Sequence, residues 1–391
     1  MAHPNIAALT SLHAGTLSWN IPDSAVRHYY RRHDSDNYVS SYTADYTPDY
    51  IEVQVASSGL PSVNTMWMGA VSGGSQYDGS NTISNPRCGN VGALDTATAH
   101  MTNGRLRTYY KLAPDTGTVT STYTVVSGNT RWSMGAMSFY NVDQTNPFVF
   151  QYYDSTALGL ASSGANRQNL LYSSTVGDNG IWAPHGSMYV GIYSPGFGSQ
   201  VTANSESIQL WNRTGSGGTS YPDAQACYIQ KGNGSFLALT AWQTHHYYGG
   251  NSSYASRNTY SNHAVIRPDE SGTLLFTVPS HYSIKVTGVY VSCNMSDSYA
   301  SLKLKGLAAG TTSIVASDGS TKVIEATGSV AENWVVRNKP LDRTATVNLI
   351  DAPIYMVEGD SLYGVYLSGA PEQWKSDEYA NVTVSFESLA D

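Results

Sequence analysis

Histidine is concentrated at one place in the chain, and imidazole nitrogens are common ligands of zinc and related metals. His245 and His246 are adjacent, and His263 follows within the same region. Adjacent residues of a strand point to opposite faces of a sheet, so one ion would need an irregular backbone and a third ligand. A glycine-flanked surface loop is the simpler interpretation. The sequence therefore predicts no metal site and no cofactor.

The same region is rich in tyrosine, within the run HHYYGGNSSYASRNTY. Exposed tyrosine rings on a framework of Gly, Ser and Asn are typical of contact surfaces, because the ring offers a large amphipathic area at small entropic cost. Such rings can stack on sugar faces or pack on another subunit. Tyr247, Tyr248 and Tyr254 are the candidate recognition residues, and a purely structural loop is the alternative.

Other chemical motifs are weak. The segment from Asp34 to Asn37 has the oxygen spacing of a calcium turn, but it lacks the glutamate and glycine of an EF-hand loop. The sequence contains no GxSxG, HExxH, GxxxxGK[ST] or CxxC motif. Carboxylates are numerous in turns, and the spatial separation that defines a glycosidase pair is not readable from sequence. We therefore expect no enzymatic activity.

Composition favours a β-rich protein. Charged residues make up 13% of the 391 residues, and the chain has 29 Tyr against 7 Phe, whereas about 25% charged residues is usual. The net charge of −8 opposes a general nucleic-acid surface. The one basic run, Arg27 to His33, is followed at once by Asp34 and Asp36, which predicts an exposed, self-neutralised loop.

The cysteines and the N-terminal sequence bear on the compartment. Three widely spaced cysteines imply no disulfide scaffold. The N-terminus has no signal-peptide pattern, and no apolar stretch is long enough to span a bilayer. We expect folding in a reducing cytoplasm and no membrane insertion.

The last third of the chain reads as a β-sandwich. In Asn381 to Leu389, Val382, Val384 and Phe386 alternate with polar residues, the two-residue period of a half-buried strand. We expect these three side chains to be buried, with Trp334 and Tyr355 as neighbours. The Glu358-Gly359-Asp360 corner predicts a turn in which glycine takes a positive φ.

Four segments carry a resemblance to a known family: MAHPNIAALTSLHAGTLSWNIP (Met1 to Pro22), LLFTVPSHYSIKVTGVYVS (Leu274 to Ser292), DAPIYMVEGDSLYG (Asp351 to Gly364) and NVTVSFE (Asn381 to Glu387). Together they resemble a small β-domain of virion proteins from tailed phages, especially those of marine and cyanobacterial hosts. The resemblance implies that this domain is split by a large insertion. Residues 1–22 would then pair with the sandwich of residues 272–391.

The insertion has a resemblance of its own. Residues 111–148, which contain VDQTNP (Val142 to Pro147), are similar to an immunoglobulin-like domain of phage appendages and bacterial surface proteins. Asp143 is expected to bond the backbone ahead of it in a tight turn. The expected organisation is a connector over residues 23–49, an immunoglobulin-like sandwich over 50–212, and a linker with a β-rich loop region over 213–271. ALDTATAHM (Ala93 to Met101) is the best candidate for a helical turn.

The sequence therefore predicts an all-β protein with two or three β-sandwich domains of jelly-roll or immunoglobulin-like type and Gly/Ser/Tyr-rich loops. The resemblances imply a structural component of the tailed-phage virion, assembled in the host cytoplasm: an exposed appendage or decoration of head, neck or tail. Expected partners are other virion proteins and further copies of the chain, with a trimer as first choice. The alternative is a receptor-binding tail adhesin for host surface polysaccharide; a glycan-degrading depolymerase is a third class.

Overall fold

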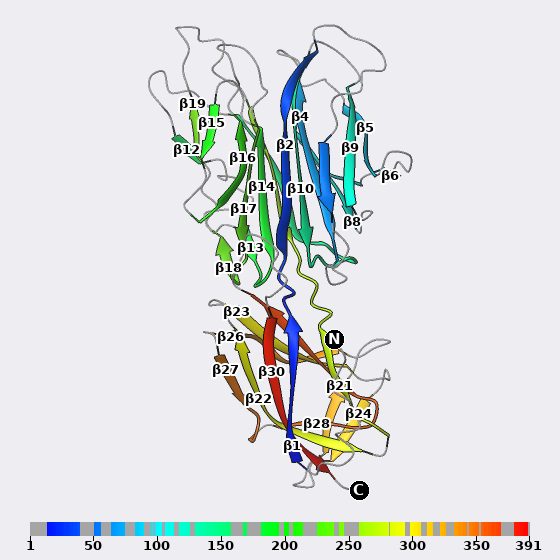
Figure 1. Ribbon diagram of the computed structural model, residues 1–391. Helices are drawn as coiled ribbons and strands as arrows, with labels where there is room; N and C mark the ends of the chain where they lie inside the picture. Colours follow the sequence, from blue (N-terminus) through cyan, green and yellow to red (C-terminus); the bar gives the residue numbers. More distant parts are fainter. Residues whose placement is uncertain are drawn as a thin grey trace. The chain divides into compact units, whose positions relative to one another are not determined.

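A computed structural model of the 391-residue chain describes residues 14–39, 51–55, 64–74, 83–89, 95–96, 98–103, 106–112, 117–125, 130–157, 167–169, 181–194, 199–202, 206–213, 225–237, 242–245, 258–280, 282–293, 298–305, 311–315, 321–325, 332–341, 344–351, 353–368 and 379–389. Within these residues every helix or strand assigned is a β-strand, so the all-β prediction is confirmed (Figure 1). The strands form two compact units. The terminal unit contains both described ends of the chain, and the central unit lies within residues 26–268.

The terminal unit is built from two main antiparallel sheets. One has the order β1-β30-β22-β27, with β28 also paired to β22; these strands are Ala14–Pro22, Tyr379–Leu389, Ser283–Cys293, Thr344–Asn348 and Ile354–Met356. The other has the order β21-β29-β23-β26; these strands are Thr273–Thr277, Ser361–Leu367, Ser298–Lys305 and Glu332–Leu341. A separate hairpin joins β24 (Thr311–Val315) to β25 (Thr321–Glu325).

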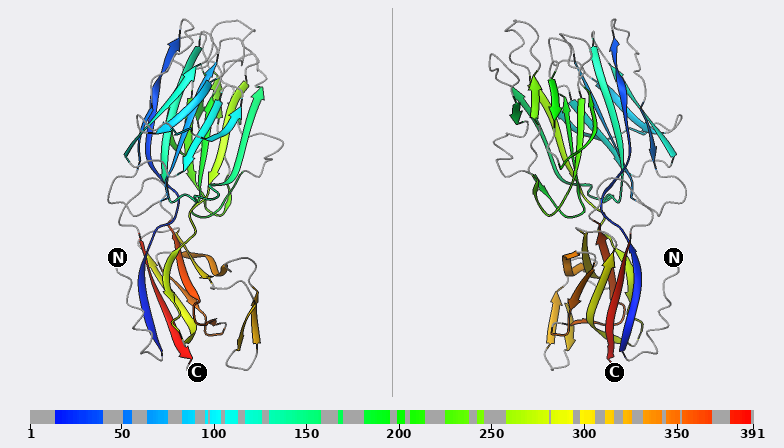
Figure 2. Two further views of the ribbon diagram at one scale, coloured as in Figure 1. Left: turned by 90° about the vertical axis from the view of Figure 1, so that its right-hand side faces the viewer. Right: turned by 60° about the vertical axis from the view of Figure 1, so that its left-hand side comes forward.

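The two described ends of the chain meet in the first of these sheets. β1 pairs with β30 along its whole length, with Trp19 opposite Val382 and Leu17 opposite Val384. Figure 2 shows the blue β1 beside the red β30 in both views. This is the pairing that the sequence predicted for the N-terminal segment, here over Ala14–Pro22.

The apolar residues of both sheets form one core, which makes the terminal unit a β-sandwich. Val382, Val384 and Phe386 are all buried, as the alternation predicted. Trp19 of β1 stacks on Phe276 of β21 with ring centroids 5.9 Å apart. Tyr355 is buried as well, whereas the side chain of Trp334 lies outside the described set.

Hydrogen bonds fix two short connecting segments of this sandwich. Gly359 has φ 86°, which confirms the positive φ predicted at the Glu358–Asp360 corner. There the Val357 amide donates to Asp360 Oδ2 at 2.9 Å, and burial raises the pKa of this carboxyl. Just after β1, Asp23 accepts the backbone N–H and the hydroxyl of Ser368 at 2.8 and 3.0 Å, which fixes the end of β1 to the end of β29.

The central unit also has two main antiparallel sheets. The first has the order β2-β10-β4-β8-β7; these strands are Arg27–Val39, Thr130–Tyr140, Met66–Gly74, Leu106–Leu112 and Thr98–Asn103. The second has the order β11-β20-β14-β17-β16; these strands are Phe148–Ala157, Asn258–Ile266, Met188–Ser194, Gln225–Lys231 and Ile208–Arg213. One hydrophobic core takes residues from both sheets, including Met137 and Phe139 from the first and Ile192 and Ile229 from the second.

Smaller sheets complete the central unit. One has the order β3-β9-β5-β6, with strands Ile51–Val55, Gly117–Val125, Ile83–Gly89 and Asp95–Thr96. Another has the order β12-β19-β15, with strands Arg167–Asn169, Trp242–His245 and Ser199–Thr202. The last is a pair of short strands, β13 (Ile181–Ala183) and β18 (Ser235–Leu237).

Polar groups also join the two main sheets of the central unit. Asn262 Nδ2 on β20 donates to Thr108 Oγ1 on β8 at 2.8 Å, and both residues are fully buried. Arg31 Nη1 on β2 donates to the carbonyls of Gln209 and Leu210 on β16 at 2.8 and 2.9 Å. These hydrogen bonds restrain the position of one sheet on the other more closely than apolar packing alone would.

The VDQTNP element forms the tight turn that the sequence predicted. Asp143 Oδ1 accepts the amides of Thr145 and Asn146 at 2.8 and 3.0 Å, which confirms the predicted side-chain-to-backbone bond. Gln144 Nε2 donates to the Thr65 carbonyl at 3.1 Å, and the Asp143 amide donates to the Arg267 carbonyl at 3.1 Å. The turn thereby ties the start of β4 and the end of β20 to the connection between β10 and β11.

Three local expectations differ from the structure. Residues 27–39, expected within an irregular connector with an exposed basic loop, form β2, and Arg27 and His28 are buried at 1% and 5% exposure. β2 is an edge strand paired with β10, and polar Arg27 and His28 occupy buried positions in it, so its sequence lacks the apolar alternation that predicts a strand. β17 to β20 lie in the region expected as a linker with a β-rich loop region, yet β17 and β20 are inner strands of a main sheet. The segment expected to form a helical turn, residues 93–101, contains β6 and the first four residues of β7.

Candidate functional site

The predicted recognition residues Tyr247, Tyr248 and Tyr254 lie outside the residues that the structure describes, as does His246. Their role as a recognition cluster stays a prediction. His245 is the last residue of β19. Asp34 and Asp36 lie inside the extended strand β2 rather than in a turn, which argues against the weak calcium-turn pattern.

His263 is a buried residue of the central unit rather than part of a surface cluster. Its ring is fully buried on β20, with Nδ1 2.8 Å from the Tyr189 hydroxyl and Nε2 2.9 Å from Ser261 Oγ. The Tyr189 hydroxyl is also 3.1 Å from the hydroxyl of Tyr193, which lies four residues later on the same face of β14. Four polar side chains therefore form one continuous buried network.

Burial decides what this network can do. A serine hydroxyl against an imidazole is the pairing used in nucleophilic catalysis, but burial lowers the pKa of His263 to about 3, so the ring is a weak base. Burial likewise raises the pKa of the Tyr189 hydroxyl well above its usual range. Each group is held in its neutral form, which suits a network that joins β14 to β20.

The outward side of the β1-β30-β22-β27 sheet forms a continuous polar surface on the terminal unit, here called the polar face. Beside Ala14, Pro22 and Tyr379 at its margins, it is made of residues that alternate with the buried ones: Thr16, Ser18, Asn20, Asn381, Thr383, Ser385, Glu387, Lys285, Gly288, Tyr290, Ser292, Thr344, Thr346 and Asn348. Hydroxyl and amide groups predominate, and the charge of this set is confined to Lys285 and Glu387. Its chemistry suits hydrogen bonding with an uncharged polar partner.

A β-bulge places Tyr290 on this face. The register of β22 against β30 shifts between Val286 and Gly288, so Thr287 is an extra residue. Before the bulge the inward residues are Ile284 and Val286, and after it they are Val289 and Val291. Without the shift, Tyr290 would point into the core; instead its ring is 43% exposed.

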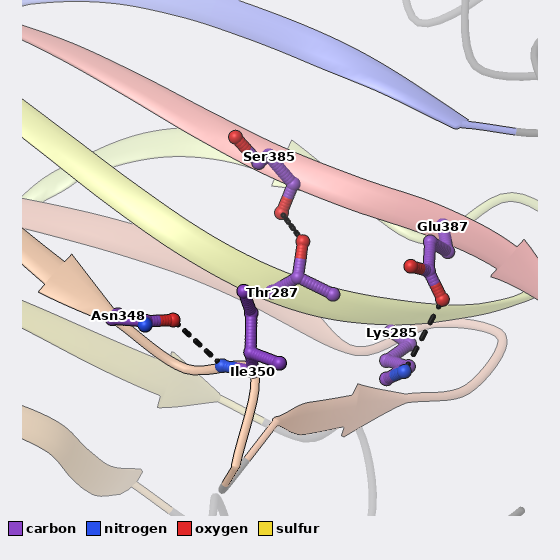
Figure 3. Close-up of polar contacts among 6 residues, drawn as sticks. All are labelled: Lys285, Thr287, Asn348, Ile350, Ser385 and Glu387. Carbon is purple, nitrogen blue, oxygen red and sulfur yellow. Dashed lines mark hydrogen bonds and ion pairs between the residues drawn. The ribbon is translucent and has the colours of Figure 1, made fainter.

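Figure 3 shows how side chains at one end of the polar face are fixed. Lys285 Nζ lies 3.2 Å from Glu387 Oε2 across β22 and β30. Thr287 Oγ1 donates to the Ser385 carbonyl at 3.4 Å, which bonds the bulge to β30. Asn348 Oδ1 accepts the Ile350 amide at 3.0 Å, and Ile350 is 65% exposed.

An exposed aromatic pair lies on the central unit, at the paired strands β13 and β18. Trp182 and Phe236 are directly opposite in the register, and they are 44% and 58% exposed. Their ring centroids are 5.5 Å apart, with an interplanar angle of 60°. Sequence reasoning missed this pair, although IWA and SFL each place an aromatic residue between two smaller residues, the alternation of a short half-buried strand.

The residues that the structure describes contain neither a metal-binding cluster nor a helix able to span a membrane. Among those residues, no group of three or more His, Cys, Asp or Glu side chains is arranged to hold a metal ion. No helix in the same part of the chain has the length and hydropathy needed to cross a bilayer.

Comparison of the chain with protein-family models gave no match, and a search of curated proteins found no significant relative.

Proposed function

We propose that this protein is a non-enzymatic structural component of a tailed-phage virion, an exposed appendage or decoration of head, neck or tail. The observation that supports this proposal is the pairing of β1 with β30. The segments that resemble the phage virion domain supply all of β1 and β28 and most of β21, β22, β29 and β30, and these strands pack around one core. A single sandwich closed by both described ends of the chain agrees with a virion domain that carries an insertion.

In this proposal the terminal unit is the virion-associated body and the central unit is the displayed part. The polar face is the surface offered to neighbouring virion subunits, including further copies of the chain. Its hydroxyl and amide groups both donate and accept hydrogen bonds, and a wet, polar contact of this kind is common between proteins. The strand edges β1 and β27 border the same surface.

Deleting the coding sequence from the phage tests the proposal. Loss of the protein from purified particles, with complete infectivity, would support a decoration protein. Particles that never contained the chain, as judged by mass spectrometry of the purified parent phage, would refute the proposal. Release of reducing sugars from host polysaccharide by the purified chain would instead favour a depolymerase.

The second candidate is a receptor-binding adhesin for host surface polysaccharide. The exposed pair Trp182 and Phe236 favours it, because large exposed aromatic side chains are typical of contact surfaces. Normal assembly with lost adsorption in the deletion phage would support this candidate. Replacing Tyr247, Tyr248 and Tyr254 by Ala tests the tyrosine cluster separately, because adsorption equal to that of the parent would show that this cluster has no recognition role.

A further inference from the structure

The aromatic pair of Trp182 and Phe236 stands on a hydrophobic base. Ile181, Ala183 and Leu237, the neighbours of these residues in β13 and β18, are buried and pack with Tyr189 and Val265 of the underlying sheet. Neighbouring residues of a strand alternate between faces, so the two aromatic rings point away from that sheet. The pair is therefore presented outward on strands whose opposite face is anchored.

The turns next to the pair are closely packed. The Gly234 amide donates to the Ala183 carbonyl at 2.9 Å, and the Gly232 amide donates to the Ser187 carbonyl at 2.8 Å. A Cβ atom on Gly234, where φ is 75°, would lie 2.2 Å from Nε2 of His185. Because the backbone is fixed in this way, binding through the two rings would lose little conformational entropy.

The groups around the pair define the ligand chemistry. Residues 181–187 and 232–237 contain no Asp, Glu, Lys or Arg, and the nearest charged residue in the described sequence is the half-buried Lys231. Burial lowers the pKa of His185, so that ring is also neutral at pH 7. Asn233 and Ser235 are exposed and uncharged, and Asn233 Oδ1 accepts both the amide and the hydroxyl of Ser235. A nucleic acid would need cationic side chains to match its phosphates.

We propose that Trp182 and Phe236 bind a sugar ring of a neutral polysaccharide. A hexose ring has an apolar face of C–H groups, which suits the electron-rich face of an aromatic ring, and hydroxyl groups at its edge, which suit the NH2 group of Asn233. The two rings have centroids 5.5 Å apart and so form one joint aromatic surface for such a ligand. The inference rests on the adhesin candidate and narrows its ligand from host surface polysaccharide in general to neutral polysaccharide.

Binding by the purified full chain tests this inference without the phage. The chain is applied to an array of neutral and acidic glycans, and the best neutral oligosaccharide is then titrated by calorimetry. Trp182→Ala and Phe236→Ala should each weaken binding at least about tenfold, the effect of roughly 1.4 kcal/mol. Ile350→Ala is the matched control, because Ile350 is an exposed large apolar residue, at 65%, that belongs to the terminal unit. Thermal unfolding of each variant checks that the fold is intact.

Neutral-glycan binding that is lost in both aromatic variants and kept in Ile350→Ala would support the inference. Binding only to acidic glycans, no glycan binding, or equal loss in all three variants would overturn it. The result is independent of the virion proposal, because the presence of the chain on particles is measured by mass spectrometry and not by glycan binding.

Discussion

Ile21 of β1 packs directly on Gly364 of β29, so that a Cβ atom on Gly364 would lie 2.2 Å from Ile21 Cδ1. Ile21 is 1% exposed, and 343 positions separate the two residues in the sequence (364 − 21). The contact therefore fastens the first described strand to the second sheet of the terminal sandwich. A side chain at position 364 would have to displace part of that core.

Gly364→Ala should destabilise the terminal unit by roughly 1–3 kcal/mol, because the added methyl group overpacks a closed core. Ile21→Val removes Cδ1 and alone should cost about 0.5–1.5 kcal/mol. The double variant should cost less than the sum, because the clashing atom is gone. Hydrogen-exchange mass spectrometry of peptides from β1 and β30 measures each local stability. Strict additivity would show that the two residues do not share this contact.

Phe386→Ala should destabilise the same unit by about 3–5 kcal/mol, since the ring is 2% exposed within the core. Thr383→Ala, three positions earlier, is the control. Its hydroxyl lies 2.6 Å from Ser18 Oγ in an exposed pair, so the change should stay within about 0.5 kcal/mol. Similar losses in β30 protection for the two variants would mean that the inward and outward faces are wrongly assigned.

Thr108→Val should destabilise the central unit by about 1–3 kcal/mol, because the buried Asn262 amide would lose the hydroxyl that accepts its 2.8 Å hydrogen bond. Thr108→Ser keeps the acceptor and loses only a methyl group, which is worth about 1 kcal/mol. Hydrogen-exchange mass spectrometry of peptides from β8 and β20 measures the change in stability. A serine variant as unstable as the valine variant would show that volume, rather than the hydrogen bond, determines the effect.

The stability of the central unit should fall as the pH drops below about 6.5, the ordinary histidine pKa. Burial lowers the pKa of His263 to about 3, so between these values the unfolded chain binds a proton that the folded chain does not. One such group approaches a slope of about 1.4 kcal/mol per pH unit in this window. His263→Gln should be less stable at pH 8 but should depend less on pH between 6.5 and 5. Parallel curves for parent and variant, from denaturant unfolding, would contradict a neutral buried His263.

Much of the terminal sandwich was predictable because its strands alternate cleanly. Val382, Val384 and Phe386 were assigned to the buried face from spacing alone. The bulge at Thr287 was missed, although the spacing of Val286 and Val289 breaks the two-residue period next to Gly288. That break determines which side of the sheet Tyr290 occupies.

The central unit was harder to predict because its strands do not alternate simply. β14, most of β17 and residues 261–266 of β20 are buried on both faces, so the polar residues Tyr189, Gln230 and His263 lie inside the unit, although polar residues usually indicate a surface. Short strands such as β13 and β18 give too few residues for a periodic signal. Trp182 and Phe236 become a pair only through a strand pairing across more than fifty residues (236 − 182 = 54), which no local pattern reports.

Antibody labelling of intact phage particles tests the virion proposal most directly. Antibody raised against the purified chain and imaged by electron microscopy should decorate one defined location, head, neck or tail, on every parent particle, and should leave deletion particles unlabelled. Absence of label from parent particles, with the chain found only in the lysate, would contradict the proposal that it is a virion component.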